Sequence, residues 1–139
     1  TSSMVSEISP IVSYLKHIVR ADDSAKTLLI IEEPEAHLHP SIQIKLMEIF
    51  AELSNNNVKI IMTTHSNYMF NKFNNLILAN KINKETAIAM IFESSEHGSI
   101  AYNALLSQFG AKDSNFAETS EEIYNEKIQL INALNATQR

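Results

Sequence analysis

Apolar residues in the first half of the chain follow two spacings, one typical of helices and one typical of buried strands. Residues 8–19 repeat apolar side chains every three or four positions, which predicts an amphipathic helix. Residues 27–32 and 58–63 are nearly continuous apolar runs, as expected of parallel strands covered on both faces. Pro40 suits the first turn of a further helix, which the polar residues 55–57 end.

The second half predicts shorter elements. A helix is expected over residues 66–73, followed by strands at 76–79 and 86–93. The polar residues 80–84 between these strands favour a turn, so the two strands are expected to form a hairpin. A loop is expected at residues 94–98.

The last part of the chain predicts two helices. A short one is expected within residues 102–109. Thr119, with Glu122 three residues later, resembles a capping box that opens a final amphipathic helix. The whole pattern predicts an α/β fold in one domain, with a mostly parallel sheet flanked by helices and an antiparallel strand pair near its edge.

Composition narrows the class of protein. The 139 residues suffice for one domain with a core, and their apolar fraction of 45% is ordinary for globular proteins. No run approaches the roughly 20 apolar residues that span a bilayer, so no membrane partner is expected. With no cysteine, disulfides and thiolate metal sites are excluded, and a cytoplasmic location is the default expectation. The net charge of -5, without a basic cluster, suggests that any contact with DNA is made by other regions of a larger protein.

Two adjacent acids, Glu32 and Glu33, end the first predicted strand. Carboxylates at the end of a buried strand are costly unless a cation or a solvent-filled cleft meets them, and ligands of open α/β sheets bind at this edge. Because neighbouring strand residues point to opposite faces, one acid could hold Mg²⁺ while the other orients an attacking water. The alternative is that both acids begin a solvated loop.

Histidines follow both predicted strands. His65 comes after the second strand, so we expect it at the same sheet edge as Glu33, where it could contact a γ-phosphate. The alternative is a surface histidine before a helix capped by Ser66. His37 and His39 could chelate zinc with Glu35 as a third ligand, although no other His or Cys lies nearby in sequence.

The segment LLIIEEPEAHLHP, residues 28–40, resembles the Walker B motif and D-loop of ABC-type ATPase heads, in the form typical of the OLD family and related AAA_21-type ATPases. The resemblance implies that Glu32 takes the Mg²⁺-linked position, where the wider family usually has Asp, and that Glu33 is the catalytic Glu. It places residues 36–39, including His37 and His39, in the D-loop. TTHS in turn resembles the switch histidine motif, with His65 as the switch. His39 could also simply cap the helix opened by Pro40.

The start of the chain resembles the ABC signature region less closely. Ser2 or Ser3, ahead of a helix N-terminus, could supply the hydroxyl that binds a γ-phosphate held by a partner subunit. Met4 stands where the family usually has Gly, and its side chain could obstruct the backbone from approaching the phosphate. A plain N-cap serine is the alternative.

The Walker A loop, GxxxxGK[ST], is missing from these residues, because neither Gly98 nor Gly110 begins such a motif. In the family's order the loop would precede Thr1, and the chain's start without Met also suggests a fragment. The resemblance therefore implies a separate N-terminal half with Walker A, binding of ATP and Mg²⁺ in a head-to-tail homodimer, and an inactive isolated fragment.

The expected organisation is a signature-like start at 1–20, Walker B and D-loop at 27–40, the switch motif at 58–66 and a closing lobe at 75–139. The closing lobe carries no recognisable chemistry, and the absence of a DxD pair excludes a Toprim nuclease within this sequence. Two other functions stay open: a non-enzymatic relic or regulatory docking module, and a zinc-dependent hydrolase built on His37 and His39.

Overall fold

The computed structural model describes residues 13, 27–112 and 115–137. The helix predicted over residues 8–19 lies outside this part except for Ser13, which is helical. The signature-like residues Ser2, Ser3 and Met4 also lie outside the described residues.

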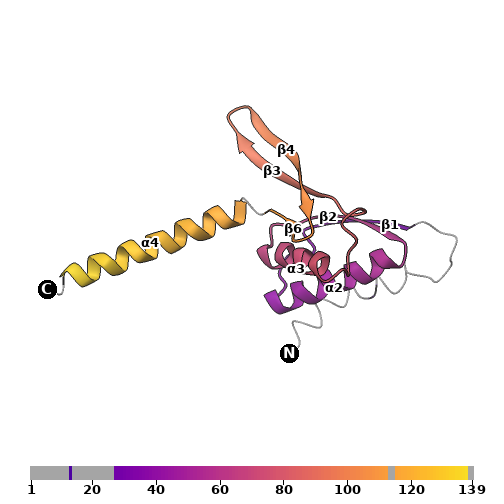
Figure 1. Cartoon of the computed structure of the whole chain (residues 1–139), viewed down its shortest axis with the longest axis horizontal. Coiled ribbons are helices and arrows are strands. Elements are labelled where there is room, and N and C mark those ends of the chain that lie inside the picture. Colours follow the sequence, from indigo (N-terminus) through magenta and orange to yellow (C-terminus); the bar gives the residue numbers. More distant parts are fainter. Residues whose placement is uncertain (1–12, 14–26, 113–114, 138–139) are drawn as a thin grey trace.

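A β–α–β unit forms the centre of the described chain (Figure 1). Strand β1, Thr27–Glu32, pairs in parallel with β2, Val58–Thr63, and helix α2, Pro40–Asn55, connects them. Thr27 lies opposite Val58 and Glu32 opposite Thr63, so the two strands begin and end together. Both strands have the bounds predicted from their apolar runs. The α/β class is therefore confirmed, although the parallel sheet has two strands in the described part of the chain.

The core lies between this sheet and two helices, α2 and α3, Asn67–Leu78, which lie on the same side of the strands (Figure 1). Among the described residues, Phe50 of α2 and Met69 of α3 are the largest side chains that are almost fully buried. The core cluster consists of Leu29, Leu38, Leu46, Met47, Phe50, Ala51, Val58, Met69 and Leu76.

Among the described residues, no element covers the opposite face of the sheet, so the expectation of strands covered on both faces is wrong for this part of the chain. Burial alternates along β1: Leu29 is 3% exposed, whereas Ile30 is 70% exposed. Leu28 and Ile61, on the same face as Ile30, are also more than half exposed. The physical reason is that the described helices that contribute to the core pack against one face. An apolar sheet face is therefore left accessible.

Helix α3 replaces two predicted elements. The helix expected over residues 66–73 continues to Leu78, and the strand predicted at 76–79 is wrong. Leu76 and Ile77 are buried at helical spacing from Met69, which lies in the core. A short apolar run such as residues 76–79 does not distinguish a strand from a buried helical turn. The hairpin predicted from this strand is therefore also wrong.

The antiparallel pair of the structure is a different hairpin. Strand β3, Ala89–Ser95, pairs with β4, Gly98–Ala104, around a turn at Glu96 and His97, within the loop expected at 94–98. Gly98 has φ +120°, which favours glycine at this turn. The helix predicted within residues 102–109 is wrong, because Ile91 and Tyr102 pair across the two strands and fix the extended conformation.

A small hairpin joins this region to α3. Strands β5, Leu106–Ser107, and β6, Gly110–Ala111, form a two-stranded antiparallel sheet. The side chain of Asn74 accepts a hydrogen bond from the Ala111 amide at 2.8 Å and donates one to the Ala111 carbonyl at 3.1 Å. Gly110 has φ +92°, and a Cβ atom there would lie 2.2 Å from Asn74 Oδ1. Only glycine fits this contact without displacing Asn74.

Helix α4, Asn115–Thr137, extends away from the other elements (Figure 1). It begins four residues before Thr119, so the capping box predicted there is wrong. Its apolar side chains are largely exposed, among them Ile123, Leu130 and Leu134. None of the helices in the described ranges combines the length and apolar character that crossing a membrane requires.

Candidate functional site

Two loops meet at the carboxyl edge of the parallel sheet. Glu33 follows β1 directly, and its backbone N–H donates to the carbonyl of Thr63 at 3.1 Å and to the Thr63 hydroxyl at 3.2 Å. These bonds continue the pairing of β1 with β2 for one residue beyond Glu32. The loops that carry Glu33 and His65 therefore start side by side, as their positions after two parallel strands predicted.

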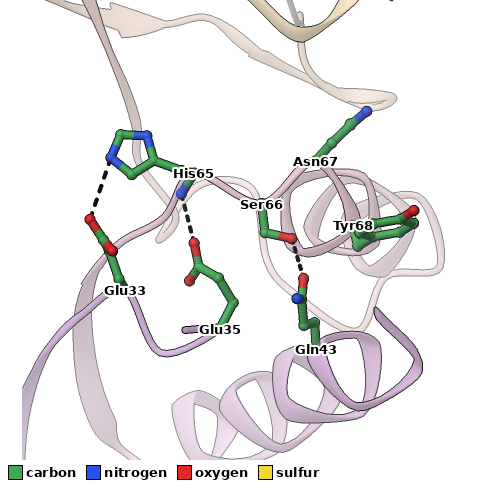
Figure 2. A pocket seen from close by; sticks show the side chains of 7 residues that line it. All are labelled: Glu33, Glu35, Gln43, His65, Ser66, Asn67 and Tyr68. Carbon is green, nitrogen blue, oxygen red and sulfur yellow. Dashed lines mark hydrogen bonds and ion pairs between the residues drawn. The ribbon is translucent and has the colours of Figure 1, made fainter. Parts of the chain in front are cut away.

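Glu33 and His65 face each other across this edge (Figure 2). Glu33 Oε1 lies 3.5 Å from His65 Nε2, and the two side chains are 51% and 87% exposed. The backbone of Glu33 has φ +43°, an uncommon value for a residue other than glycine. This left-handed turn takes the chain out of the strand and directs the carboxylate towards His65. Both groups remain accessible to a ligand.

Glu35 connects the loop after β1 to the loop after β2 by two hydrogen bonds. Its Oε1 accepts a hydrogen bond from the Thr64 hydroxyl at 2.6 Å and another from the backbone N–H of His65 at 2.7 Å. Its Oε2 is buried and has no hydrogen-bond partner in the part of the chain that the structure describes. The Thr64 oxygen also accepts from the backbone N–H of Ser66 at 3.0 Å. Glu35 therefore holds the backbone of the histidine whose side chain faces Glu33.

Ser66 and Gln43 form a second connection at the same place (Figure 2). Ser66 is the N-cap of α3, and its buried hydroxyl accepts from the backbone N–H of Met69 at 3.2 Å. The same hydroxyl donates to Gln43 Oε1 of α2, while Gln43 Nε2 donates to the carbonyl of Leu38 at 2.8 Å. The cap expected of Ser66 is thus present, and Gln43 joins it to the loop after β1.

These residues line an open pocket of about 450 Å³. In Figure 2, Glu33, Glu35 and His65 lie at one end of it, and Asn67 and Tyr68 of α3 lie at the other. A helix N-terminus carries partial positive charge, so the pocket combines two carboxylates, an imidazole and the N-terminal end of α3. The imidazole and the helix end suit an anionic group of a polar ligand, whereas the carboxylates suit a hydrogen-bond donor such as water.

Glu32 lies on the other side of the strand end. It belongs to the exposed set of β1, together with Leu28 and Ile30, and does not line the pocket. Glu32 and Glu33 therefore occupy different environments, as the alternation along a strand predicted. Glu32 lies opposite Thr63 in the strand register and is exposed.

His37 and His39 lie outside the pocket. His39 is the N-cap of α2: its Nδ1 accepts from the Ser41 backbone N–H at 3.3 Å and lies 2.9 Å from the Ser41 hydroxyl. His37 is exposed and has φ +64°. Throughout the described residues, no three His, Cys, Asp or Glu side chains form a group that could hold a metal ion. The zinc alternative at His37 and His39 thus gains no support from a third ligand.

Sequence reasoning missed the roles of Glu35 and Gln43. The sequence indicates Glu35 only as a possible third metal ligand and gives no sign of a role for Gln43 on its helix. The partners Thr64, His65 and Ser66 lie 23 to 30 residues away in the sequence, so no local periodicity indicates these contacts. The only available signal was the spacing of Glu35, two residues after Glu33 in a loop expected to reach the site.

A comparison with protein families finds one relation. The model of the AAA ATPase domain matches residues 2–70, just under half of the chain. This segment contains β1, α2, β2 and the first residues of α3, and hence Glu33 and His65. The match supports a relation to AAA-type ATPases and, through it, a P-loop-like fold and an ATPase-type function. No curated protein and no solved structure matches the chain.

Proposed function

We propose, from the relation of residues 2–70 to the AAA ATPase domain, that the chain is the C-terminal part of an ABC-type, OLD-like ATPase head that binds and hydrolyses ATP. The observation that carries the proposal is the Glu33–His65 pair. It joins a carboxylate and an imidazole at 3.5 Å, at the carboxyl edge of parallel strands, inside the matched segment. Ligands of open α/β sheets bind at this edge.

Glu33 is the group that orients the attacking water. Its accessible carboxylate accepts a hydrogen bond from the water and can take up the proton as the oxygen attacks the γ-phosphorus. The bond between the γ-phosphorus and the oxygen bridging to the β-phosphate breaks, and ADP leaves with that electron pair. His65 donates a hydrogen bond to a γ-phosphate oxygen, where negative charge must be stabilised. The N-terminus of α3 favours the same anionic group.

Glu32 is the candidate to support Mg²⁺. Carboxylate oxygens and water are the ligands that Mg²⁺ prefers, and Glu32 offers an exposed carboxylate next to Thr63 in the register. This donor set fits a magnesium ion held through water. When bound, Mg²⁺ supplies neutralisation of the phosphate charge. Glu32 then orients water molecules, while Glu33 is left for the attacking water.

The phosphate cradle must come from an N-terminal half that carries Walker A. Both glycines, Gly98 and Gly110, begin hairpin strands directly after a turn, so neither serves a phosphate-binding loop. The open sheet face with Leu28, Ile30 and Ile61 supports such a partner, because exposed apolar faces are typical of interaction sites. We therefore expect the isolated chain to be inactive.

The active unit in this proposal is a head-to-tail homodimer with ATP between its subunits. The D-loop residues His37 and His39, which are exposed, communicate across the dimer, and Ser2 or Ser3 contacts the γ-phosphate bound mainly to the other subunit. The process served is DNA-related or defensive, with DNA contacted by other regions. The cytoplasm is the expected location.

A second candidate function is a regulatory docking module derived from an ATPase. The open sheet face and the exposed apolar side chains of α4 favour it, since both features suit protein partners. In this alternative the Glu33–His65 pair performs no hydrolysis.

ATP turnover by the complete gene product, compared with Glu33→Gln, separates the two functions. Glutamine keeps the size of the side chain but cannot accept the proton, so we expect ATP binding to persist while turnover falls by about 10²- to 10⁴-fold. Glu52→Gln, on the exposed part of α2, is the matched control and should retain wild-type turnover. Normal turnover by Glu33→Gln would exclude the proposed role of Glu33. An intact Walker A upstream without any turnover, even with DNA added, would favour the docking module.

A further inference from the structure

We propose that Glu35 is a positioning residue that sets the place of His65 relative to Glu33. The inference rests on the ATPase function proposed above and adds a residue to which that function gave no role. Its basis is the pair of hydrogen bonds from the Thr64 hydroxyl and the His65 backbone N–H to Glu35 Oε1, at 2.6 and 2.7 Å. Glu35 touches neither the attacking water nor the phosphate in this proposal and acts through His65.

The contact between Glu33 and His65 is too weak to fix the positions of the two side chains by itself. At 3.5 Å, with side chains 51% and 87% exposed, it is a long and solvent-screened interaction. The two Glu35 bonds are shorter; the bond from the Thr64 hydroxyl is partly buried, the bond from the His65 N–H is exposed, and a carboxylate acceptor strengthens both. The distance between Glu33 and His65 is therefore set by the bonds between the loops.

The position of Glu35 in the chain makes this coupling direct. It lies two residues after Glu33, in the same loop, and its acceptor oxygen binds the backbone of His65 itself. Thr64 extends the connection, because its oxygen also accepts from the Ser66 N–H at the start of α3. A shift of either loop must stretch these bonds, so Glu35 transmits the position of one reacting group to the other.

The second oxygen of Glu35 indicates that the carboxylate is not there for stability alone. Oε2 is buried and lacks a hydrogen-bond partner among the described residues, an arrangement that is unfavourable for folding. A charged acceptor nevertheless forms stronger bonds than a neutral amide in the same place. We therefore expect a graded series in which Glu35→Gln weakens the positioning and Glu35→Ala removes it.

Two measurements on the complete gene product test this series. Hydrogen exchange at the His65 amide, read at single-residue resolution by fragmentation mass spectrometry without nucleotide, reports the bond directly. Loss of the bond in Glu35→Ala should speed that exchange by about tenfold or more, with Glu35→Gln between the two. The amide of Phe50 in the core should keep its wild-type rate, because the change is local. Glu52→Ala, on the exposed part of α2, is the matched control.

Steady-state kinetics give the functional readout. Because His65 acts on charge in the transition state, we expect Glu35→Ala to lower kcat by about 10- to 100-fold, with KM within about twofold of wild type. Glu35→Gln should recover part of the loss in kcat. A merely structural role predicts instead that Phe50 exchange rises, or that KM and kcat change together.

The outcomes separate this inference from the proposed function. Unchanged His65 exchange in Glu35→Ala overturns the positioning contact whatever the kinetics show. Faster exchange with unchanged kcat overturns the catalytic consequence of that contact. A wild-type protein without turnover overturns the proposed function, and the positioning role with it, while the exchange data still decide whether Glu35 holds His65. If Glu35→Ala does not fold, the nearly isosteric Glu35→Gln carries the same two readouts.

Discussion

Ser66 joins α3, α2 and the loop after β1, so replacing it with alanine tests how these parts are held together. The Ser66→Ala change removes the N-cap acceptor of the Met69 amide, a loss that costs about 1 kcal/mol. It also leaves Gln43 Oε1 without the hydroxyl donor, which costs about another 1 kcal/mol. Because Ser66 is buried, solvent replaces neither bond easily, and the expected loss of unfolding free energy is about 2 kcal/mol.

A double-mutant cycle with Gln43→Leu separates the two contributions. In the Gln43→Leu background the second loss is already present, so Ser66→Ala should cost only the cap, about 1 kcal/mol. The measurement is urea unfolding followed by far-UV circular dichroism, with all four proteins fitted to a common dependence on urea. Ser54→Ala, an exposed serine near the end of α2, is the control and should stay within about 0.5 kcal/mol of wild type.

The coupling between the two positions decides the outcome. We expect about 1 kcal/mol of interaction free energy between Ser66 and Gln43. If Ser66→Ala costs the same in both backgrounds, to within about 0.3 kcal/mol, Gln43 does not depend on the hydroxyl and the connection between α2 and α3 is refuted.

Two further predictions concern the contact between β6 and α3 and the ion pair between α2 and α3. Gly110 has a left-handed backbone, and the Cβ of Gly110→Ala would collide with the Asn74 side chain that holds the Ala111 amide, so hydrogen exchange at that amide should accelerate. Gly98→Ala is the control, because a Cβ at Gly98 meets nothing within 4 Å. Equal exchange rates at Ala111 in the two variants would contradict the contact between Gly110 and Asn74. The Lys72 side chain donates a hydrogen bond to Glu48, and this bond, together with the lysine charge, lowers the pKa of Glu48 below its ordinary value of 4.5. The pair should therefore stabilise the fold above about pH 4.5 and lose this effect as pH falls through the folded pKa. The difference in unfolding free energy between wild type and Glu48→Gln should be present at neutral pH and vanish in acid; a difference independent of pH would exclude the pair as its source.

The β–α–β unit could be predicted from the sequence because each of its elements carries a strong local signal. Thr27–Glu32 and Val58–Thr63 are apolar runs of strand length, and Pro40 and the asparagines after Leu53 mark the ends of α2. The Glu33–His65 pair followed from these strands, since the carboxyl ends of parallel strands meet at one edge. The positions of the two strand ends therefore predicted that these two side chains would lie close together.

The remaining fold could not be predicted, because its signals are short or depend on distant residues. The residues Leu76 and Ile77 fit a strand or a helix equally well, and only their burial at helical spacing from Met69 shows that they are helical. Tyr102 is extended because it pairs with Ile91, which a local pattern does not show. The hydrogen bonds of Glu35 and Gln43 could not be predicted for the same reason, because their partners are set by the paths of two loops and not by spacing in the chain.

The register between β1 and β2 determines how the two loops of the candidate site are aligned. A one-residue slip would exchange the buried and open faces of β1, so Leu29 and Ile31 would leave the core. A two-residue slip preserves the faces but carries Glu33 about 7 Å along the strand, at roughly 3.3 Å per residue, and out of reach of His65. A slip by an odd number of residues would therefore expose core side chains, and a slip by an even number would separate Glu33 from His65. Side chains that never meet a ligand, such as Leu29 and Val58, set the alignment of the two loops.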